Sequence, residues 1–265
     1  MKIIAEIGWN HMGDMDLAKK MISEAAKSGA DYCKFQTWSV KNLKTGSWDK
    51  DGRREIYTKA ELSEEKHYEL KDYCEKNNVK FLSTIFNIKD LLMLKDLTPS
   101  LIKIGSPEAY NIRLIEKCLD NFEKVIVSTG ATKWSEILQY KNLEKINNLV
   151  LMHCVSAYPC ELKNINLTKM TMLKEITSAV GYSGHYEGVD DAIAAISNNA
   201  EYIEKHFTID KNLPGRDNKF AILPNQMKFI CDYRDNYLKM IEFKGLDFQE
   251  VEENVFKEAR GRWSK

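Results

Sequence analysis

Apolar runs alternate with helix-period segments along the whole chain. Short runs rich in β-branched and aromatic residues predict strands, because side chains on one face of a strand recur every second residue. These runs lie at 2–8, 32–36, 80–86, 101–104, 125–129, 149–154, 178–182 and 202–207. Apolar residues spaced three and four apart predict helices between them, at 14–28, 63–77, 88–97, 111–121, 134–147, 167–176, 188–199 and about 224–240.

Eight strands, each followed by a helix, predict parallel pairing with crossover helices. The count favours a (β/α)₈ TIM barrel, and 265 residues is an ordinary length for such a domain. An open doubly wound sheet is the alternative, because counting elements does not distinguish the two. We expect the barrel to span 1–242. We expect residues 243–265 to form a C-terminal tail without a second domain, which packs as a final helix or reaches a partner chain.

Composition narrows the range of partners. The 39 basic and 39 acidic residues cancel, so no overall field favours nucleic acid or an anionic membrane, and a small-molecule substrate is expected. No apolar run approaches the roughly 20 residues of a membrane span, and Glu6 stands too early for a signal-peptide core. Six scattered cysteines without a CxxC pair predict free thiols and a cytoplasmic location.

Two insertions are longer than the usual loops of such a fold. Residues 38–62 follow the second strand and residues 211–223 follow the eighth, so both belong to the face where barrel strands end. We expect them to form walls or lids of a site. Simple linkers are the alternative.

Charged and hydroxyl-bearing side chains collect near the ends of the predicted strands. Period-two alternation places these groups on the inward rows: Glu6, Lys34, Gln36, Thr84, Lys103, Ser128, His153, Ser183, Glu204 and His206, with Ser106, Glu108 and His185 just beyond. Unpaired buried charges are costly, so a barrel without a site has no reason to carry them. The convergence predicts an enzyme, although any single lysine could instead form an internal salt bridge with one of the glutamates.

The residue types indicate complementary roles. Cations and hydroxyl donors suit a phosphorylated or carboxylated ligand, and they come from Lys34, Lys103, Ser106, Ser128 and Ser183. No Walker-type loop or GxGxxG follows the first strand, so nucleotide binding is not indicated. A divalent metal could bind His185 and His206 at neighbouring strand ends, while either histidine alone is more simply a polar strand end. Candidate catalytic carboxylates, for proton transfer or for stabilising a cationic intermediate, are Glu6, Glu108 and Glu204.

Several of these residues lie in motifs that occur in a familiar order. The motifs are AEIGWNHMGD (5–14), ADYCKFQT (30–37), FLST (81–84), KIGSPE (103–108), STG (128–130), HCVSAYP (153–159), GYSGH (181–185) and EKHFT (204–208). Together they resemble the sialic acid synthase (N-acetylneuraminate synthase) family over residues 1 to about 240.

The resemblance implies a (β/α)₈ barrel that condenses phosphoenolpyruvate with the open-chain aldehyde of an N-acetylhexosamine-like sugar. The product would be a nonulosonic or related 2-keto-3-deoxy sugar acid, with phosphate released by C–O cleavage. The implied cofactor is Mn²⁺, with Mg²⁺ or Co²⁺ as alternatives, held by His185 and His206. Glu108 would lie near the reacting carbons. Phosphoenolpyruvate would contact Lys34, Thr84, Lys103, Ser106, Ser128, Ser156 and Ser183, and the sugar would contact Glu6, Tyr158, Glu204 and Asp217.

Departures from the family pattern concentrate on the sugar side. Family members typically carry a second, antifreeze-like domain that supplies an arginine to a partner's sugar pocket, and this chain ends at Lys265, about where that domain would begin. Gly184-His185-Tyr186 stands where an Asp-His-Thr run is usual, Gly215-Arg216-Asp217 replaces Gly-Pro-Asp, and Met12 replaces an asparagine. We therefore expect an intact phosphoenolpyruvate and metal half and a changed acceptor half. Arg216 would either replace the missing arginine or form a surface salt bridge.

Two other functions fit the same residues. A pyruvate aldolase or lyase could use Lys34 or Lys103 as a Schiff-base amine on the same barrel. A ligand-binding or assembly subunit without catalytic activity could retain the pocket. A second copy of the chain is a further possible partner, in a homodimer.

Overall fold

Eight parallel strands close into a barrel in sequence order in the computed structural model, which describes residues 1–263. Each strand pairs with its sequence neighbours, and β8 closes the ring against β1. The predicted (β/α)₈ barrel is therefore confirmed. The strands are β1 (Lys2–Gly8), β2 (Tyr32–Thr37), β3 (Lys80–Ile85), β4 (Leu101–Ile104), β5 (Lys124–Ser128), β6 (Leu149–Cys154), β7 (Ala179–Gly184) and β8 (Tyr202–His206).

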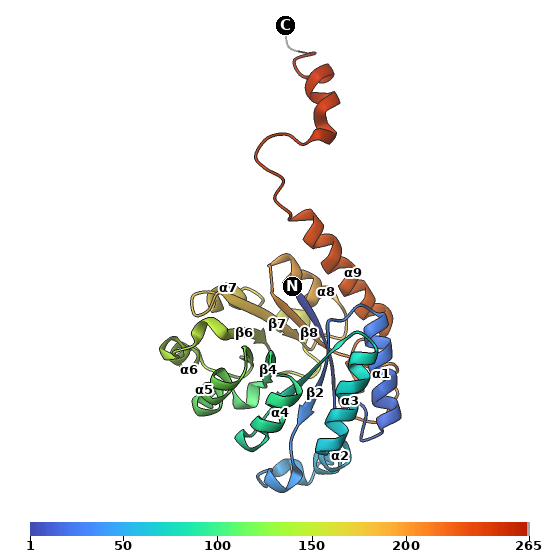
Figure 1. The fold of residues 1–265 in the computed structure, drawn as a ribbon, viewed down its shortest axis with the longest axis vertical. Coiled ribbons are helices and arrows are strands. Elements are labelled where there is room, and N and C mark those ends of the chain that lie inside the picture. Colours follow the sequence, from blue (N-terminus) through green and yellow to red (C-terminus); the bar gives the residue numbers. More distant parts are fainter. Residues whose placement is uncertain (264–265) are drawn as a thin grey trace.

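Helices surround the barrel on its outer side (Figure 1). Their first turns are fixed by side-chain caps: Asp14, Ser63 and Asn111 each accept a hydrogen bond from a backbone N–H three residues on. The helices of the described residues are α1 (Met15–Lys27), α2 (Arg53–Ala60), α3 (Glu64–Lys76), α4 (Leu91–Leu97), α5 (Ile112–Asn121), α6 (Trp134–Leu138), α7 (Lys169–Leu173), α8 (Asp190–Ser197) and α9 (Pro224–Met240).

The strands carry two apolar layers. Outward residues pack with the helices into the main core, where α1 contributes Ala18, Met21, Ile22 and Ala25. Inward residues fill the lower barrel as a separate cluster of Ile4, Tyr32, Leu82, Leu101, Ile126, Val150, Met152, Ala179 and Tyr202. The barrel is therefore closed by packing below, and only its upper end, where the strands finish, can hold a ligand.

Two predicted elements differ from the structure. The helix expected over 134–147 ends at Leu138 and is followed by the 3₁₀ turns Gln139–Asn142 and Ile146–Asn148. The insertion at 38–62 is not an irregular loop: it holds α2 and two 3₁₀ turns. Other strand and helix ends shift by a few residues.

Residues after α9 project away from the barrel (Figure 1). Their side chains are mostly exposed, and a local contact stacks the Phe248 ring on the Phe256 ring with centroids 4.2 Å apart. Residues 264 and 265, the end of the predicted tail, lie outside the described residues. Within residues 1–263, no helix has the length and apolar character needed to cross a membrane. The six cysteines are buried and free, as predicted.

Candidate active site

A cavity of about 1030 Å³ opens at the carboxyl ends of the strands. Its floor consists of strand-end side chains from most of the barrel, and its walls come from the two insertions and from the loops after β3, β4 and β6. The strand-end residues that alternation placed inward meet there and are buried: Glu6, Lys34, Thr84, Lys103, Ser128, Ser183, Glu204 and His206. The cavity is therefore located where the sequence predicted it.

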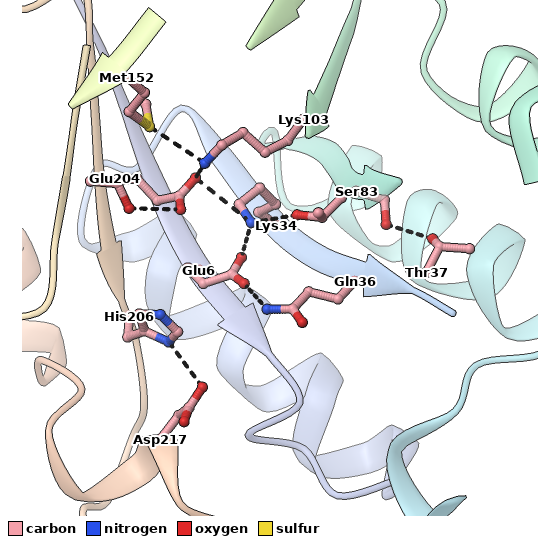
Figure 2. Close-up of polar contacts among 12 residues, drawn as sticks. Glu6, Lys34, Gln36, Thr37, Ser83, Lys103, Met152, Glu204, His206 and Asp217 are labelled. Atoms are coloured by element: carbon pink, nitrogen blue, oxygen red, sulfur yellow. Dashed lines mark hydrogen bonds and ion pairs between the residues drawn. The ribbon is translucent and has the colours of Figure 1, made fainter. Parts of the chain in front are cut away.

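Two lysines and two glutamates form one network on the cavity floor (Figure 2). Lys34 Nζ lies 2.6 Å from Glu6 Oε2 and 3.7 Å from Glu204 Oε2, and it donates to Thr84 Oγ1 at 2.8 Å. Lys103 Nζ donates to Glu204 Oε2 at 2.8 Å. The far ends of the carboxylates accept from neighbours, namely Gln36 Nε2 to Glu6 Oε1 at 2.6 Å and Ser183 Oγ to Glu204 Oε1 at 3.1 Å.

The four charges cancel, but the two carboxylates differ electrostatically. Burial by itself raises the pKa of Glu204, yet Lys103 and Lys34 hold that pKa down to about 2. Burial also raises the pKa of Glu6, and Lys34 only partly offsets it. Glu204 is thus a fixed anion, whereas Glu6 is the carboxyl that takes a proton more readily. Burial lowers the pKa of Lys103 although Glu204 opposes this.

Hydroxyls and a backbone amide form a cradle beside this floor. Ser106 Oγ accepts a hydrogen bond from the Gly130 N–H at 3.1 Å and lies 3.1 Å from Cys154 Sγ. A Cβ on Gly130 would collide with Ser156 Oγ and would crowd Ser106 Oγ and Cys154 Sγ, so only glycine keeps this space open. A hydroxyl group held in this way suits phosphate oxygens as a donor.

His185 and His206 face each other on the other side of the cavity, with ring centroids 5.4 Å apart. Burial lowers the pKa of His185 to about 4 and, with His185 beside it, lowers the pKa of His206 well below the usual range. His185 Nδ1 donates to the Val155 carbonyl at 2.7 Å, which leaves its Nε2 as a bare acceptor. His206 Nδ1 has no hydrogen-bond partner among residues 1–263. Both rings are therefore neutral imidazoles with a free nitrogen, the form in which histidine binds metals.

The donor set around the histidines is small. Asp217 Oδ2 lies 3.5 Å from His206 Nδ1, and burial raises the pKa of Asp217 to about 7. The Tyr158 ring lies tilted against His185 with centroids 4.2 Å apart, and the Phe220 ring centroid lies 5.0 Å from that of His206. Within residues 1–263, no three His, Cys, Asp or Glu side chains converge as a ready-made metal site. The two histidines fit a divalent cation as two nitrogen ligands, with substrate or water oxygens completing its coordination.

Glu108 lies apart from the charged network. It belongs to the 3₁₀ turn Ser106–Glu108 after β4, is half-buried, and lines the cavity wall. Its Oε2 accepts from Asn111 Nδ2 at 2.9 Å. The sequence-predicted residues thus divide between a buried floor and a partly exposed wall, except Ser156, which is exposed and does not line the cavity.

His153 corrects the prediction for the sixth strand. Alternation was expected to bring it inward, but Val150 and Met152 occupy the interior row, and His153 points to the helix side. There its Nε2 donates to the Ile165 carbonyl at 2.7 Å and its ring packs near Tyr182. All six residues of β6 are buried, so burial on both faces hid which row faces inward.

An aromatic wall that sequence reasoning missed covers one side of the cavity. The Tyr57 ring of α2 lies 5.0 Å from Trp9, 5.4 Å from Trp38 and 5.5 Å from Trp48, all in edge-to-face contact. Three of these four rings belong to the 38–62 insertion, whose tryptophans and tyrosine were the available signal. Arg216 lines the same side, and no carboxylate of residues 1–263 lies within ion-pair distance of it. The role of Arg216 in the acceptor pocket stays a prediction.

Comparisons with known proteins agree with this site. Residues 21–244 match the model of the NeuB family. The N,N'-diacetyllegionaminic acid synthase of Campylobacter jejuni is 38% identical over 247 residues, which cover 86% of this chain and 74% of that protein. The N-acetylneuraminate-9-phosphate synthase of Drosophila melanogaster is 33% identical over 89% of this chain and 67% of that protein.

A solved structure extends the likeness to three dimensions. The N-acetylneuraminic acid (sialic acid) synthetase of Leptospira borgpetersenii superimposes with a TM-score of 0.85 at 31% identity, covering 99% of this chain and 92% of that one. The match includes the barrel and the strand ends from which the cavity is built. The chain therefore belongs to the NeuB family and is a transferase of the sialic acid synthase type.

Proposed function

We propose that the protein condenses phosphoenolpyruvate with the aldehyde of an N-acetylhexosamine-like sugar to give a nonulosonic or related 2-keto-3-deoxy sugar acid and phosphate. The observation that carries the proposal is a single cavity in which a lysine and hydroxyl floor faces two neutral histidines. Relatives named as synthases of N,N'-diacetyllegionaminic acid and N-acetylneuraminate 9-phosphate support the reaction class.

The floor offers the groups that a small dianion needs. Phosphate oxygens fit the Ser106 hydroxyl, whose oxygen is held by the Gly130 N–H, while Lys34 and Lys103 supply the charge. An entering anion competes with Glu6 and Glu204 for the two lysines. Because burial already raises the pKa of Glu6, we expect Glu6 to take up a proton at this point while Glu204 keeps its charge.

Bond changes follow from the two substrates. C3 of the enol forms a bond to the aldehyde carbon, and the aldehyde oxygen takes a proton. Water adds to C2, the C2–O bond breaks, and phosphate leaves with that oxygen. Carboxyl groups beside the cavity can exchange the protons, and we assign this role to Glu6 and Glu108. Glu204 opposes positive charge that develops at C2, because its low pKa keeps it ionised.

His185 and His206 would hold the divalent metal, with Mn²⁺ the first candidate. When bound, the ion supplies Lewis-acid polarisation of the aldehyde oxygen. The chain's own contribution is to keep both rings neutral by burial and to orient His185 through its bond to the Val155 carbonyl. Asp217, Tyr158 and the aromatic wall would contact the acceptor sugar.

The test is an assay with Mn²⁺, phosphoenolpyruvate labelled with ¹⁸O in the C2–O–P bridge, and a panel of aldoses and N-acetylated hexosamines. We expect release of labelled phosphate together with a new 2-keto acid, and loss of both on adding EDTA. Label retained in the keto acid would contradict C–O cleavage. Binding of phosphoenolpyruvate and Mn²⁺ without turnover on any acceptor would instead indicate a ligand-binding subunit.

The lowered pKa of Lys103 favours one second candidate, a Schiff-base pyruvate aldolase. Borohydride reduction in the presence of pyruvate separates the two reactions. A covalent adduct at Lys103 would support the aldolase, whereas an unmodified protein that requires metal and phosphoenolpyruvate supports the synthase.

A further inference from the structure

A buried ion pair lies on the helix side of β7 and β8, outside the cavity. Lys205 Nζ lies 2.9 Å from Oδ1 and 2.8 Å from Oδ2 of Asp191, the second residue of α8. Both side chains are at most 1% exposed. A lysine and an aspartate this deeply buried are held by each other, because neither charge is solvated.

The pair connects the two histidine-bearing segments. Lys205 directly precedes His206 in β8, and its Nζ also donates to the Tyr186 carbonyl at 2.6 Å. Tyr186 directly follows His185, so one lysine ties the strand of one histidine to the loop of the other. Tyr182 of β7 completes the network by donating to Asp191 Oδ2 at 3.1 Å.

Gly184 leaves the space that the Asp191 carboxylate of α8 occupies. It pairs with Lys205 in the β7–β8 register and points to the same side of the sheet. A Cβ at this position would collide with Asp191 Oδ2 and would also stand 2.7 Å from the Tyr182 ring. Its φ lies outside the left-handed region, so the backbone would accept another residue. Glycine is needed here for space: the Asp191 carboxylate fills the volume that a side chain at 184 would occupy.

We infer that Asp191 and Lys205 are positioning residues that fix the separation of His185 and His206. The inference rests on the metal-binding role of that pair under the proposed function. Neither residue touches the cavity, so their effect passes through the Tyr186 carbonyl and the β8 backbone. Metal affinity depends on ligand placement, and loss of supporting groups around a metal site typically weakens binding by about 10- to 100-fold.

Mn²⁺ titration followed by electron paramagnetic resonance of the free ion provides the test. Lys205→Met and Asp191→Asn should each raise the Kd for Mn²⁺ tenfold or more, while the Kd for phosphoenolpyruvate measured without metal stays within about twofold. The matched control is Lys228→Met, which removes an exposed ion pair with Asp232 on α9 and should leave both constants unchanged. Wild-type Mn²⁺ affinity in both Lys205→Met and Asp191→Asn would overturn the inference.

A carboxylate exchange provides a sharper signature. Gly184→Asp alone should weaken Mn²⁺ binding, because the new side chain collides with Asp191, and Asp191→Ala alone should weaken it by leaving Lys205 unpaired. The double variant places a carboxylate at 184 opposite Lys205. Loss of the Asp191 side chain also leaves space into which the Tyr182 ring can move away from the new side chain. It should bind Mn²⁺ at least fivefold more tightly than either single variant. A double variant no better than Asp191→Ala would contradict the exchange.

Hydrogen–deuterium exchange keeps this inference separate from the proposed function. A wild-type protein that binds no Mn²⁺ would contradict the metal site of the proposed function. The positioning role of Asp191 would then be tested by the exchange rates of the backbone amides of 184–187. These amides should exchange at least tenfold faster in Asp191→Asn, while the amides of β3 and β4 keep their protection. Uniform loss of protection would reduce Asp191 to a general contributor to stability and overturn the inference.

Discussion

The floor and the aromatic wall of the cavity differ in how they are held. On the floor, Lys34 and Lys103 are at most 3% exposed and are paired with glutamates, Lys34 with Glu6 of the neighbouring strand and Lys103 with Glu204 across the barrel. On the wall, Tyr57 is half-buried, Arg216 is exposed, and the Tyr57 ring is held by edge contacts with Trp9 and Trp38. The floor is formed by the barrel strands themselves, whereas the wall is formed by segments inserted between strands and helices.

This difference separates two kinds of function. Replacing one residue of the buried, paired floor leaves another buried charge without a partner. Such an arrangement suits chemistry common to every member of a family. Ring packing on a half-exposed insertion tolerates replacement and can follow the shape of a particular sugar. We therefore expect substitutions on the floor to abolish turnover and destabilise the fold, and substitutions on the wall to change the affinity for the acceptor alone.

Lys103→Met should give the largest effect. It removes the cation 2.8 Å from Glu204 Oε2 and leaves that buried carboxylate with Lys34 at 3.7 Å. We expect kcat/KM to fall by about 10³-fold or more and the free energy of unfolding to fall by about 3–5 kcal/mol, measured by steady-state phosphate release and urea denaturation. Lys228→Met is the control, since exposed pairs contribute about 0–1 kcal/mol. A Lys103→Met enzyme within tenfold of wild type would break the distinction between floor and wall.

The pH dependence of stability is the next largest effect. Glu204 has a folded-state pKa of about 2 against an ordinary value of 4.5, so its stabilisation is complete above pH 4.5 and is lost as pH falls toward 2. Across that window the loss amounts to about 3 kcal/mol from this one group.

Glu204→Gln should therefore start less stable and lose less stability on acidification. Urea denaturation at about pH 5 and pH 3 measures the difference, which should be on the order of 2 kcal/mol in favour of the variant. Parallel acid profiles for the two proteins would show that Glu204 is not the anion that the lysines stabilise.

The floor was predictable because strand alternation has a fixed period of two. Lys34, Lys103 and Glu204 each occur two positions after an apolar residue of the same row, and His206 follows Glu204 in that row. The barrel brings all such rows together. The same rule was wrong for His153 because the other row of β6 is equally apolar. Alternation specifies which residues share a face but not which face is inside.

The wall was not predictable in the same way. Trp38, Trp48 and Tyr57 lie in a charged insertion without period, and the contacts of Trp38 and Tyr57 with Trp9 depend on how the insertion packs beside the loop after β1. The Asp191–Lys205 pair was hidden for a similar reason, since an aspartate in the first turn of a helix ordinarily indicates only a favourable helix start. Contacts between side chains of different elements could be identified only from the structure.

Tyr57→Ala tests the wall at its centre. Tyr57 contacts Trp9, Trp38 and Trp48, so its removal loosens the aromatic packing while leaving every floor contact in place. We expect the KM for the acceptor sugar to rise about tenfold and the KM for phosphoenolpyruvate to stay within about twofold. Tyr57→Phe keeps the ring and should stay close to wild type. Equal changes in both KM values would show that the wall and the floor act as one unit.

Arg216→Pro should give the smallest effect and isolates the charge on the wall. Arg216 has φ −68°, a value that proline adopts without strain, so the backbone can be kept while the cation is removed. If Arg216 serves as the arginine of the acceptor pocket, the KM for the sugar should rise about three- to tenfold, with kcat and the KM for phosphoenolpyruvate unchanged. Arg216→Lys is the matched variant: it keeps the charge but not the planar guanidinium, and it should recover only part of the affinity. A Pro variant with wild-type acceptor KM would mean that the aromatic rings alone select the sugar, and that the exposed cation has no part in it.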